Sequence, residues 1–168
     1  TYLTGSVRPD IAIATHQCAR FSVKSMRSHE QAVMRIGRYF LSTKEKGMIY
    51  HPDSDRGIEV FVDADFAGGW DPEDAENADN VYSRTGYVIC YAGCPMFWQS
   101  KLQTEIALLT AEAEYIALSQ ALREILPMSN LMCEMDIIFP LYLPTPKFVL
   151  KVLEDNQSCI AMTNSPKF

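Results

Sequence analysis

The stretch Ile58-Glu59-Val60-Phe61-Val62-Asp63 decides the fold class. Its β-branched residues occupy every second position, so their side chains share one face of an extended chain. This period of two predicts a β-strand that packs one face on a core and ends at Asp63. Residues 48–50 show the same short period and predict a further strand just upstream.

A loop and two more strands are predicted directly after this strand. The segment 68–83 is acidic and rich in turn formers, which is typical of an exposed loop. Residues 86–91 and 96–99 again have strand character, and Ala92-Gly93-Cys94-Pro95 between them predicts a tight turn. We therefore expect a meander of strands.

The pattern changes to that of a helix at Thr110. Apolar residues recur at spacings of three and four as far as residue 125, which gives a broad apolar face. Pro127 is expected to break or kink this helix, because proline lacks the amide hydrogen that helical bonding needs. A second helical piece is predicted over residues 129–135, and the prolines between 140 and 146 predict a connecting loop.

An apolar strand and a short helix are predicted after that loop. Residues 148–153 are largely apolar, as expected for a strand buried inside a sheet. Glu154 and Asp155 follow the strand directly. Asn156 is suited to cap a last helix that runs through Met162, because its side-chain oxygen can accept a bond from a free amide at the helix start.

The first 46 residues predict helices instead of strands. Arg8-Pro9-Asp10 places proline in the first turn of a helix that is expected to run to about Val23. Ser28-His29-Glu30-Gln31 matches a capping box and predicts a second helix that ends near Ser42. The chain is therefore expected to comprise a helical segment, 1–46, and an α/β domain, 47–168.

Composition excludes several classes of protein. With 168 residues, 48% of them hydrophobic, the chain can bury one sizeable core. Its longest apolar run is interrupted by Pro140, so we expect no membrane span. The five cysteines lack a CxxC pair and the three histidines are scattered, which favours reduced core cysteines over a disulfide framework or a zinc site. No initiator methionine or signal sequence opens the chain, so we expect its natural start to lie upstream.

The net charge of −6 is divided unevenly along the chain. Residues 1–50 hold eight Lys and Arg against three Asp and Glu, whereas residues 51–168 hold seven against eighteen. A basic segment beside an acidic one is typical of a protein whose basic part meets phosphates while its acidic part gathers divalent cations. Two solvated surfaces of opposite sign explain the charge alone equally well.

Three acidic residues occupy corresponding places in the predicted elements. Asp63 ends the first long strand, Glu114 lies one turn into the helix, and Asp155 follows the last strand. Carboxylates at strand ends and on a flanking helix can converge at one edge of a sheet, and Mg²⁺ prefers such oxygen ligands. A pair of ions held there can assist hydrolysis of a phosphodiester. Among 21 acidic residues, however, many such triplets occur, and a charged residue at a strand end is usually only solvated.

The sequence around these acids resembles copia-type retrotransposon ribonuclease H domains in four motifs that occur in the same order. Val62-Asp63-Ala64-Asp65-Phe66-Ala67-Gly68 is similar to the first catalytic strand of that family, and Ser83-Arg84-Thr85-Gly86-Tyr87 to the start of its second strand. Thr110-Ala111-Glu112-Ala113-Glu114-Tyr115-Ile116-Ala117 resembles its catalytic helix. Glu154-Asp155-Asn156-Gln157-Ser158 resembles its third acidic site.

The helical segment shares this resemblance. It resembles the segment that joins reverse transcriptase to ribonuclease H in the same family, in Tyr2-Leu3-Thr4 with Arg8-Pro9-Asp10-Ile11 and in Arg38-Tyr39 before Thr43-Lys44. The resemblance implies that residues 1–46 are the thumb or connection segment of a reverse transcriptase domain lying upstream in the same polyprotein. It also implies an intracellular location, either cytoplasmic, in a virus-like particle, or nuclear.

For residues 47–168 the resemblance implies a ribonuclease H-like mixed sheet with flanking helices. Such a domain hydrolyses the RNA strand of an RNA·DNA hybrid with two Mg²⁺ or Mn²⁺ ions and a water nucleophile, and leaves a 3′ hydroxyl and a 5′ phosphate. Asp63, Glu114 and Asp155 would be its catalytic, metal-binding carboxylates, with Asp63 bridging both ions. The neighbouring acids Asp65, Glu112 and Glu154 would have lesser roles. Helix geometry agrees for one of them, because positions 112 and 114 lie about 200° apart around a helix axis.

The chain also departs from the family pattern. Leu108 and Leu109 stand where the family often has two serines, and the loop 69–80 is longer than usual. The chain stops at Phe168, where the family continues to a further strand, a helix and a fourth acidic residue with a nearby histidine. We therefore expect a domain that is truncated at its C-terminus. The alternative is a catalytically inactive remnant with a binding or structural role, while an integrase-like nuclease fits the order of the acids less well.

Overall fold

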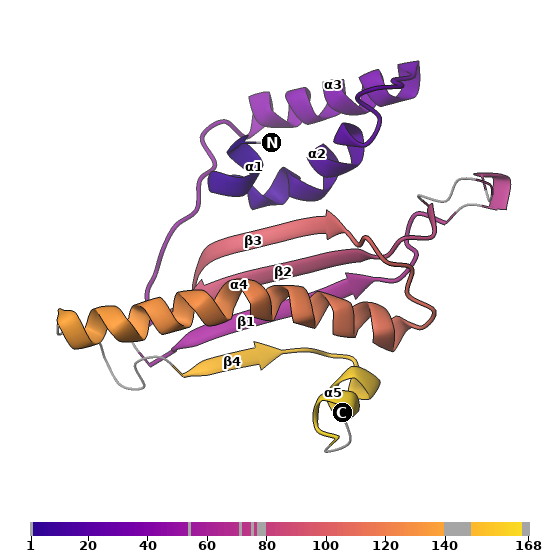
Figure 1. Ribbon diagram of the computed structural model, residues 1–168. Helices are drawn as coiled ribbons and strands as arrows, with labels where there is room; N and C mark the ends of the chain where they lie inside the picture. Colours follow the sequence, from indigo (N-terminus) through magenta and orange to yellow (C-terminus); the bar gives the residue numbers. More distant parts are fainter. Residues whose placement is uncertain are drawn as a thin grey trace. The chain divides into compact units, whose positions relative to one another are not determined.

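The computed structural model describes residues 2–53, 55–70, 72–74, 76, 80–139 and 149–165. The chain divides into two compact units, Thr1–Tyr50 and His51–Phe168 (Figure 1). The first unit is helical and the second has mixed α/β structure.

The helical unit consists of three α-helices and one 3-10 turn. These are α1 (Tyr2–Ser6), η1 (Pro9–Ile11), α2 (Ala12–Ala19) and α3 (Arg27–Ser42). Helix α1 was not predicted, and the helix that opens near Pro9 ends at Ala19, four residues before the predicted end at Val23.

The start of α3 differs from the predicted capping box at Ser28. Met26 is the N-cap residue, and its amide donates to Nδ1 of His29 at 3.0 Å. The imidazole thereby performs the role expected of a glutamate or glutamine at the third helical position.

A buried arginine joins the parts of the helical unit. The Arg8 guanidinium donates to both carboxylate oxygens of Asp10, at 2.9 and 2.8 Å, and to the Thr43 hydroxyl at 2.8 Å. Tyr39 donates its hydroxyl proton to Asp10 at 2.9 Å, and the Arg8 guanidinium lies over the Phe40 ring. The hydrogen bond from Arg8 lowers the pKa of Asp10 to about 2. These contacts connect the segment before η1 to the end of α3, 35 residues later.

The α/β unit is built on a sheet of four described strands, in the order β3-β2-β1-β4. Strand β1 (Ile58–Asp65) pairs antiparallel with β2 (Arg84–Tyr91), which pairs antiparallel with β3 (Cys94–Leu102). The predicted tight turn between β2 and β3 is present, because Ala92 and Gly93 both have positive φ, as two-residue hairpin turns require. Strand β4 (Leu150–Leu153) lies parallel to β1 on the other side. The ribonuclease H-like mixed sheet expected from the sequence is therefore compatible with the structure.

Two helices complete this unit, and a short 3-10 turn, η2 (Pro72–Asp74), lies in the loop after β1. Helix α4 (Thr110–Ile138) crosses one face of the sheet and contacts β1 and β2 (Figure 1). Helix α5 (Gln157–Thr163) follows β4, and the Asn156 side chain accepts hydrogen bonds from the amides of Ser158 and Cys159, as predicted.

The core lies between α4 and the sheet. Small residues on α4 let the helix approach the strands closely, and larger apolar side chains fill the remaining space. The fully or largely buried members are Ile58, Val60, Val62, Tyr87, Ile89, Ala117, Leu118, Ala121, Ile125 and Cys159. This contact fixes α4 against β1 and β2, which matters for the position of Glu114.

Truncating the core residue Ile125 to Ala is expected to lower the free energy of unfolding by about 2–5 kcal/mol, because burial is lost and a cavity remains. Ile125 is fully buried, whereas Ile137 on the same helix is 81% exposed. Ile137→Ala is therefore the matched control and should change stability by less than about 0.5 kcal/mol. Urea denaturation followed by circular dichroism measures both, and equal midpoints would contradict this core.

Two predicted features of the secondary structure are wrong. Residues 48–50 form no strand, because they have no pairing partner among the described strands, and Ile49 and Tyr50 are exposed. Pro127 does not break its helix, and α4 continues from Thr110 to Ile138 as one element. Pro127 is exposed although Ile125 before it and Met128 after it both contact the core, so water can satisfy the carbonyl that loses its helical partner.

The position of β4 is also different from the prediction. The apolar run 148–153 predicted a strand inside the sheet, but β4 is at the edge of the described strands and its residues alternate between half-buried and exposed. Only β1 pairs with it in the part of the chain that the structure describes. The predicted proline loop, 140–146, falls outside the described residues.

The cysteines and the lengths of the helices bear on the class of protein. The five cysteines are free, but only Cys90 and Cys159 are buried and Cys133 is exposed, so the expectation of five core cysteines is wrong. Among the described helices none is long and apolar enough to cross a membrane.

Candidate metal centre

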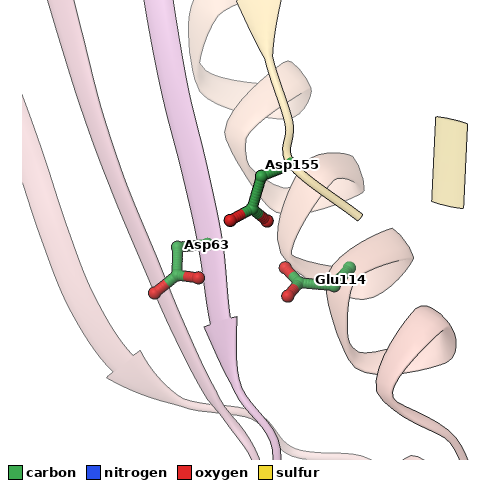
Figure 2. Close-up of side chains that lie close together, drawn as sticks. All are labelled: Asp63, Glu114 and Asp155. Carbon is green, nitrogen blue, oxygen red and sulfur yellow. The ribbon is translucent and has the colours of Figure 1, made fainter. Parts of the chain in front are cut away.

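Carboxylates from three separate elements meet beside one end of the sheet (Figure 2). Asp63 belongs to β1, Glu114 to the start of α4, and Asp155 lies two residues after β4. One carboxylate oxygen from each residue lies within 4.8 Å of the others, and the three side chains point toward a common space. The structure thus brings together the three acids that the sequence singled out. Their role as ligands stays a prediction.

Strand register explains why two of these acids meet. In the parallel pair β1 and β4, Phe61 lies opposite Leu153. Asp63 and Asp155 each follow two residues later, so the same register carries them to the same level. Parallel strands present their carboxyl ends at one edge of a sheet, which is where ligands usually bind in α/β folds.

Helix packing brings the third acid into place. Ala113 and Ala117 are fully buried where α4 packs against the sheet, and Glu114 is next to Ala113 on the border of this face. Glu114 also lies three residues before Ala117, and side chains at i and i+3 of a helix project from the same face. The glutamate therefore extends along the sheet surface toward β1 instead of into water.

Burial and like charge both act on Glu114. Only 7% of the residue is exposed. Desolvation, followed by repulsion from Glu154 and Asp63, raises the pKa of Glu114 to about 7. Its Oε2 has no hydrogen-bond partner among the described residues. A buried carboxylate oxygen without a partner is costly unless a cation or a proton satisfies it.

The acids expected to have lesser roles lie outside this cluster. Glu112 is exposed, and its Oε2 accepts a hydrogen bond from the Leu108 amide at 2.6 Å. It therefore gives a partner to an amide just before the start of α4. Asp65 is exposed at the end of β1, and any side chain at Gly68 would collide with its carboxylate. Glu112 therefore does not share the cluster with Glu114, in keeping with their separation around the helix axis, and Asp65 lies against the turn that follows β1.

Glu154 has a larger electrostatic role than the sequence suggested. Burial is the main cause that raises its pKa, and its charge in turn raises the pKa of Glu114. One oxygen accepts the Asn156 amide at 3.0 Å, while the other is buried without a partner among the described residues. Its neighbour Cys159 is fully buried, and burial together with Glu154 raises the pKa of that thiol to about 11. No sequence pattern distinguishes Glu154 from a solvated acid after a strand.

The donor set fits a divalent cation. Asp63, Glu114 and Asp155 supply only carboxylate oxygens, the ligand type that Mg²⁺ and Mn²⁺ accept, and no histidine or cysteine belongs to the described cluster. A positive charge would remove the repulsion among the three acids and satisfy the unpaired oxygen of Glu114. The cluster is therefore able to hold a metal ion.

Comparison with known proteins identifies the family. The chain is 35% identical over 136 residues to the retrovirus-related Pol polyprotein from transposon TNT 1-94 of Nicotiana tabacum, a match that covers 81% of this chain and 10% of that polyprotein. It is 28% identical over 130 residues to the Pol polyprotein from transposon RE1 of Arabidopsis thaliana. This chain belongs to the copia-type retrotransposon Pol polyproteins. The expected membership of the copia-type polyprotein family is thereby confirmed.

The copia-type chain spans about a tenth of the length of the Pol polyproteins it matches. It is also 32% identical over 123 residues to the secreted RxLR effector protein 161 of Plasmopara viticola, and this match covers 73% of the chain and 81% of that protein. No family model and no solved structure matches the copia-type chain.

Proposed function

We propose that this chain is the ribonuclease H part of a copia-type Pol polyprotein and hydrolyses the RNA strand of RNA·DNA hybrids. The observation that carries the proposal is the convergence of Asp63, Glu114 and Asp155 within 4.8 Å. Its support is that these acids lie in the three motifs that resemble the family's catalytic strand, catalytic helix and third acidic site. Residues 1–46 would be the thumb or connection segment, which joins the upstream reverse transcriptase domain to this nuclease.

The three carboxylates would hold two Mg²⁺ or Mn²⁺ ions, which when bound supply an activated water and stabilise the leaving oxygen of a phosphodiester. By resemblance to the family, Asp63 would contact both ions, and Glu114 and Asp155 would each hold one. Glu114 has to release its proton for binding, since its pKa is near 7 in the metal-free chain. Attack of water on the phosphorus would break the bond to the 3′ oxygen, so hydrolysis would leave a 3′ hydroxyl and a 5′ phosphate on the cut RNA.

Selection of RNA would depend on the sugar and not on the base. An A-form hybrid presents 2′ hydroxyls in a wide, shallow minor groove, where side chains can contact them. We expect cleavage of the RNA strand in an RNA·DNA hybrid, no cleavage of DNA·DNA, and no preference for base sequence. The activity would take place in the cytoplasm, in a virus-like particle, or in the nucleus.

Cleavage of an end-labelled RNA·DNA hybrid tests this proposal. Cuts in the RNA strand are expected with Mg²⁺ or Mn²⁺ and should disappear with a chelator. Blunt DNA·DNA of the same sequence is the substrate control. If the hybrid binds but remains intact at every concentration of divalent ion, ribonuclease activity is excluded for this chain.

The helical unit offers a surface for the phosphates of such a hybrid. Ser28, Gln31, Ala32, Arg35 and Arg38 line a hollow of about 430 Å³ along α3. Neither arginine forms an ion pair within the described parts of the chain, and Glu30, the single acid of α3, does not line the hollow. Guanidinium groups match phosphate oxygens in geometry and charge. We therefore assign phosphate contacts to this face of α3.

Removing both arginines, with Arg35→Gln and Arg38→Gln, is expected to reduce the salt dependence of hybrid binding. Each lost phosphate contact lowers the slope of log K against log salt by about 0.9 for a duplex, so the double variant should lose roughly 2. Lys44→Gln with Lys46→Gln removes the same charge from the same unit and is the matched control. Fluorescence anisotropy at several salt concentrations measures the slopes. Equal losses in both double variants would indicate a general effect of charge and not a binding face.

A non-catalytic role is the second candidate, and one observation favours it. The match to this chain covers 81% of the RxLR effector protein, which is not named as a Pol polyprotein. A segment of this kind can therefore form most of a protein outside a Pol polyprotein. A remnant of a Pol polyprotein could likewise keep the fold as a binding or structural protein. Hybrid binding without cleavage, under the conditions above, is the result that this role predicts.

A further inference from the structure

A buried glutamine joins α4, which carries Glu114, to β2, the neighbour of the strand that carries Asp63. Gln103 follows β3 directly and is only 2% exposed. Its side-chain nitrogen Nε2 donates to the carbonyl oxygen of Ala113 at 2.9 Å and to the hydroxyl of Thr85 at 3.1 Å. Both acceptors belong to fully buried residues. One side chain therefore connects the first turn of α4 with strand β2.

The two residues that accept hydrogen bonds from Gln103 are each close to one carboxylate of the cluster, Ala113 along the chain and Thr85 across the sheet. Ala113 immediately precedes Glu114. Thr85 lies opposite Ala64 in the antiparallel register of β1 and β2, and Ala64 immediately follows Asp63. The two hydrogen bonds of Gln103 therefore fix the spacing between the backbone that carries Glu114 and the backbone that carries Asp63.

The backbone of the glutamine is itself held in place. The Gln103 amide donates to the carbonyl oxygen of Ser83 at 2.8 Å, and the Ser83 hydroxyl accepts the amide of Ala67 at 3.2 Å. Ala67 has a positive φ and lies in the turn that follows β1. Ser83 is fully buried. The network thus extends from the turn after β1, through the start of β2 and the end of β3, to the first turn of α4.

Such a connection opposes a force that the site creates. Carboxylate oxygens of Glu114, Asp63 and Asp155 lie within 4.8 Å of one another, and like charges this close act to separate the start of α4 from β1 while the cluster holds no cation. Ala113 and Ala117 contribute little side-chain area there to resist the separation. A directional hydrogen bond to the Ala113 carbonyl holds the first turn at a fixed distance, whereas apolar contact alone allows sliding.

We propose that Gln103 is a positioning residue for the carboxylate cluster, and that its bonds to Ala113 and Thr85 keep Glu114 and Asp63 at metal-binding distance. This inference rests on the proposed metal site. Groups that orient metal ligands without touching the ion typically change metal affinity or activity ten- to a hundredfold when they are replaced.

The test is Mn²⁺ affinity, measured by titration calorimetry of the full chain without nucleic acid. Gln103→Met keeps the length and volume of the side chain but removes the donor, and should weaken Mn²⁺ binding by about ten- to a hundredfold. Gln103→Asn shortens the side chain so that one amide cannot reach both acceptors, and should give an intermediate loss. If Gln103→Met does not fold, the Mn²⁺ affinity of Gln103→Asn alone tests the proposal.

Ser100→Ala is the matched control. Ser100 is a buried polar residue of β3 whose hydroxyl accepts a bond from Arg84 at 3.4 Å and which is not bonded to α4. It should alter Mn²⁺ affinity by less than about twofold even if its thermal stability falls, because it does not connect two elements of the cluster. All variants are compared under conditions in which circular dichroism shows them to be folded.

The outcomes separate this proposal from the proposed function. If Gln103→Met and Gln103→Asn lose thermal stability but bind Mn²⁺ as the wild type does, Gln103 is purely structural and the metal site stands. If the wild-type chain binds no Mn²⁺, the site and the positioning role are both overturned. Weaker Mn²⁺ binding in the two glutamine variants, with the Ser100 control unchanged, is the expected result.

Discussion

Asp63→Asn should reduce cleavage of the RNA strand by about a thousandfold or more. The substitution keeps the shape of the side chain but removes the charge that would contact both ions. A bound ion supplies several kcal/mol of transition-state stabilisation, and each 1.36 kcal/mol corresponds to a factor of ten in rate. Initial rates on end-labelled hybrid, measured with saturating Mn²⁺, give the ratio of wild type to variant.

Asp65→Asn is the control for that experiment. Asp65 is an exposed acid of the same strand, two residues further along, and it does not belong to the described cluster. It should retain activity within about threefold, since surface substitutions usually have small effects. If both variants are equally active, Asp63 is not a metal ligand. If both variants are equally inactive, cleavage requires negative charge at this end of β1 but does not depend specifically on the cluster of Asp63, Glu114 and Asp155.

Metal affinity should depend steeply on pH, because Glu114 must lose a proton when it binds. Burial, with repulsion from Glu154 and Asp63, raises the pKa of Glu114 to about 7. Below that pH the affinity for Mn²⁺ should fall by about tenfold per pH unit, and above it the affinity should become constant. Calorimetric titrations between pH 5 and 8 measure this dependence. An affinity that does not change over this range would contradict the protonated state of Glu114.

The same shift in pKa predicts the pH dependence of stability in the metal-free chain. The pKa of Glu114 is higher in the folded state than its ordinary value of 4.5. The folded state therefore holds a proton between about pH 4.5 and 7 that the unfolded state has released. Stability should fall as pH rises through that window, by about 2 kcal/mol after allowance for solvent screening.

Glu114→Gln provides the control for this linkage. The variant carries no ionisable group at the site, so its stability should not share the loss between pH 4.5 and 7. At pH 8 without metal it should unfold at a higher urea concentration than the wild type, although it binds Mn²⁺ more weakly. A wild-type chain that is as stable at pH 8 as at pH 5 would contradict the burial of this carboxylate.

Elements with a strong local period could be predicted from the sequence. The alternation in 58–63, the tight turn at Ala92 and Gly93, and the Asn156 cap all depend on neighbours in the chain, and the structure confirms each of them. The three carboxylates could be selected among 21 acids only through resemblance to a known family, because solvated and ligating acids follow the same local pattern.

The errors arise where distant contacts override local preference. Residues 48–50 have strand character but no pairing partner among the described strands. Pro127 lies inside α4 because core contacts on both sides of it, at Ile125 and Met128, hold the helix, while the exposed proline leaves the freed carbonyl open to water. The apolar composition of β4 predicted an interior strand, but the position of a strand in a sheet depends on which neighbours pair with it.

Gln103 and Glu154 show what a single sequence does not reveal. Neither lies in a spacing pattern that predicts a role, since a polar residue after a strand is usually exposed. Burial of Gln103 between β2 and α4 follows from the tertiary arrangement, and so does the proximity of Glu154 to Glu114. Each could be found only after the sheet register and the packing of α4 were known.

Every activity proposed for this chain depends on a divalent ion at Asp63, Glu114 and Asp155. Nuclear magnetic resonance of the isotope-labelled chain with low amounts of Mn²⁺ tests this most directly, because the paramagnetic ion broadens the signals of nearby amides. The amides of Ala64, Glu114 and Asp155 should broaden first, while that of Tyr91, at the opposite end of β2, should remain sharp. Broadening centred on another part of the chain, or no selective broadening at all, would contradict the metal site.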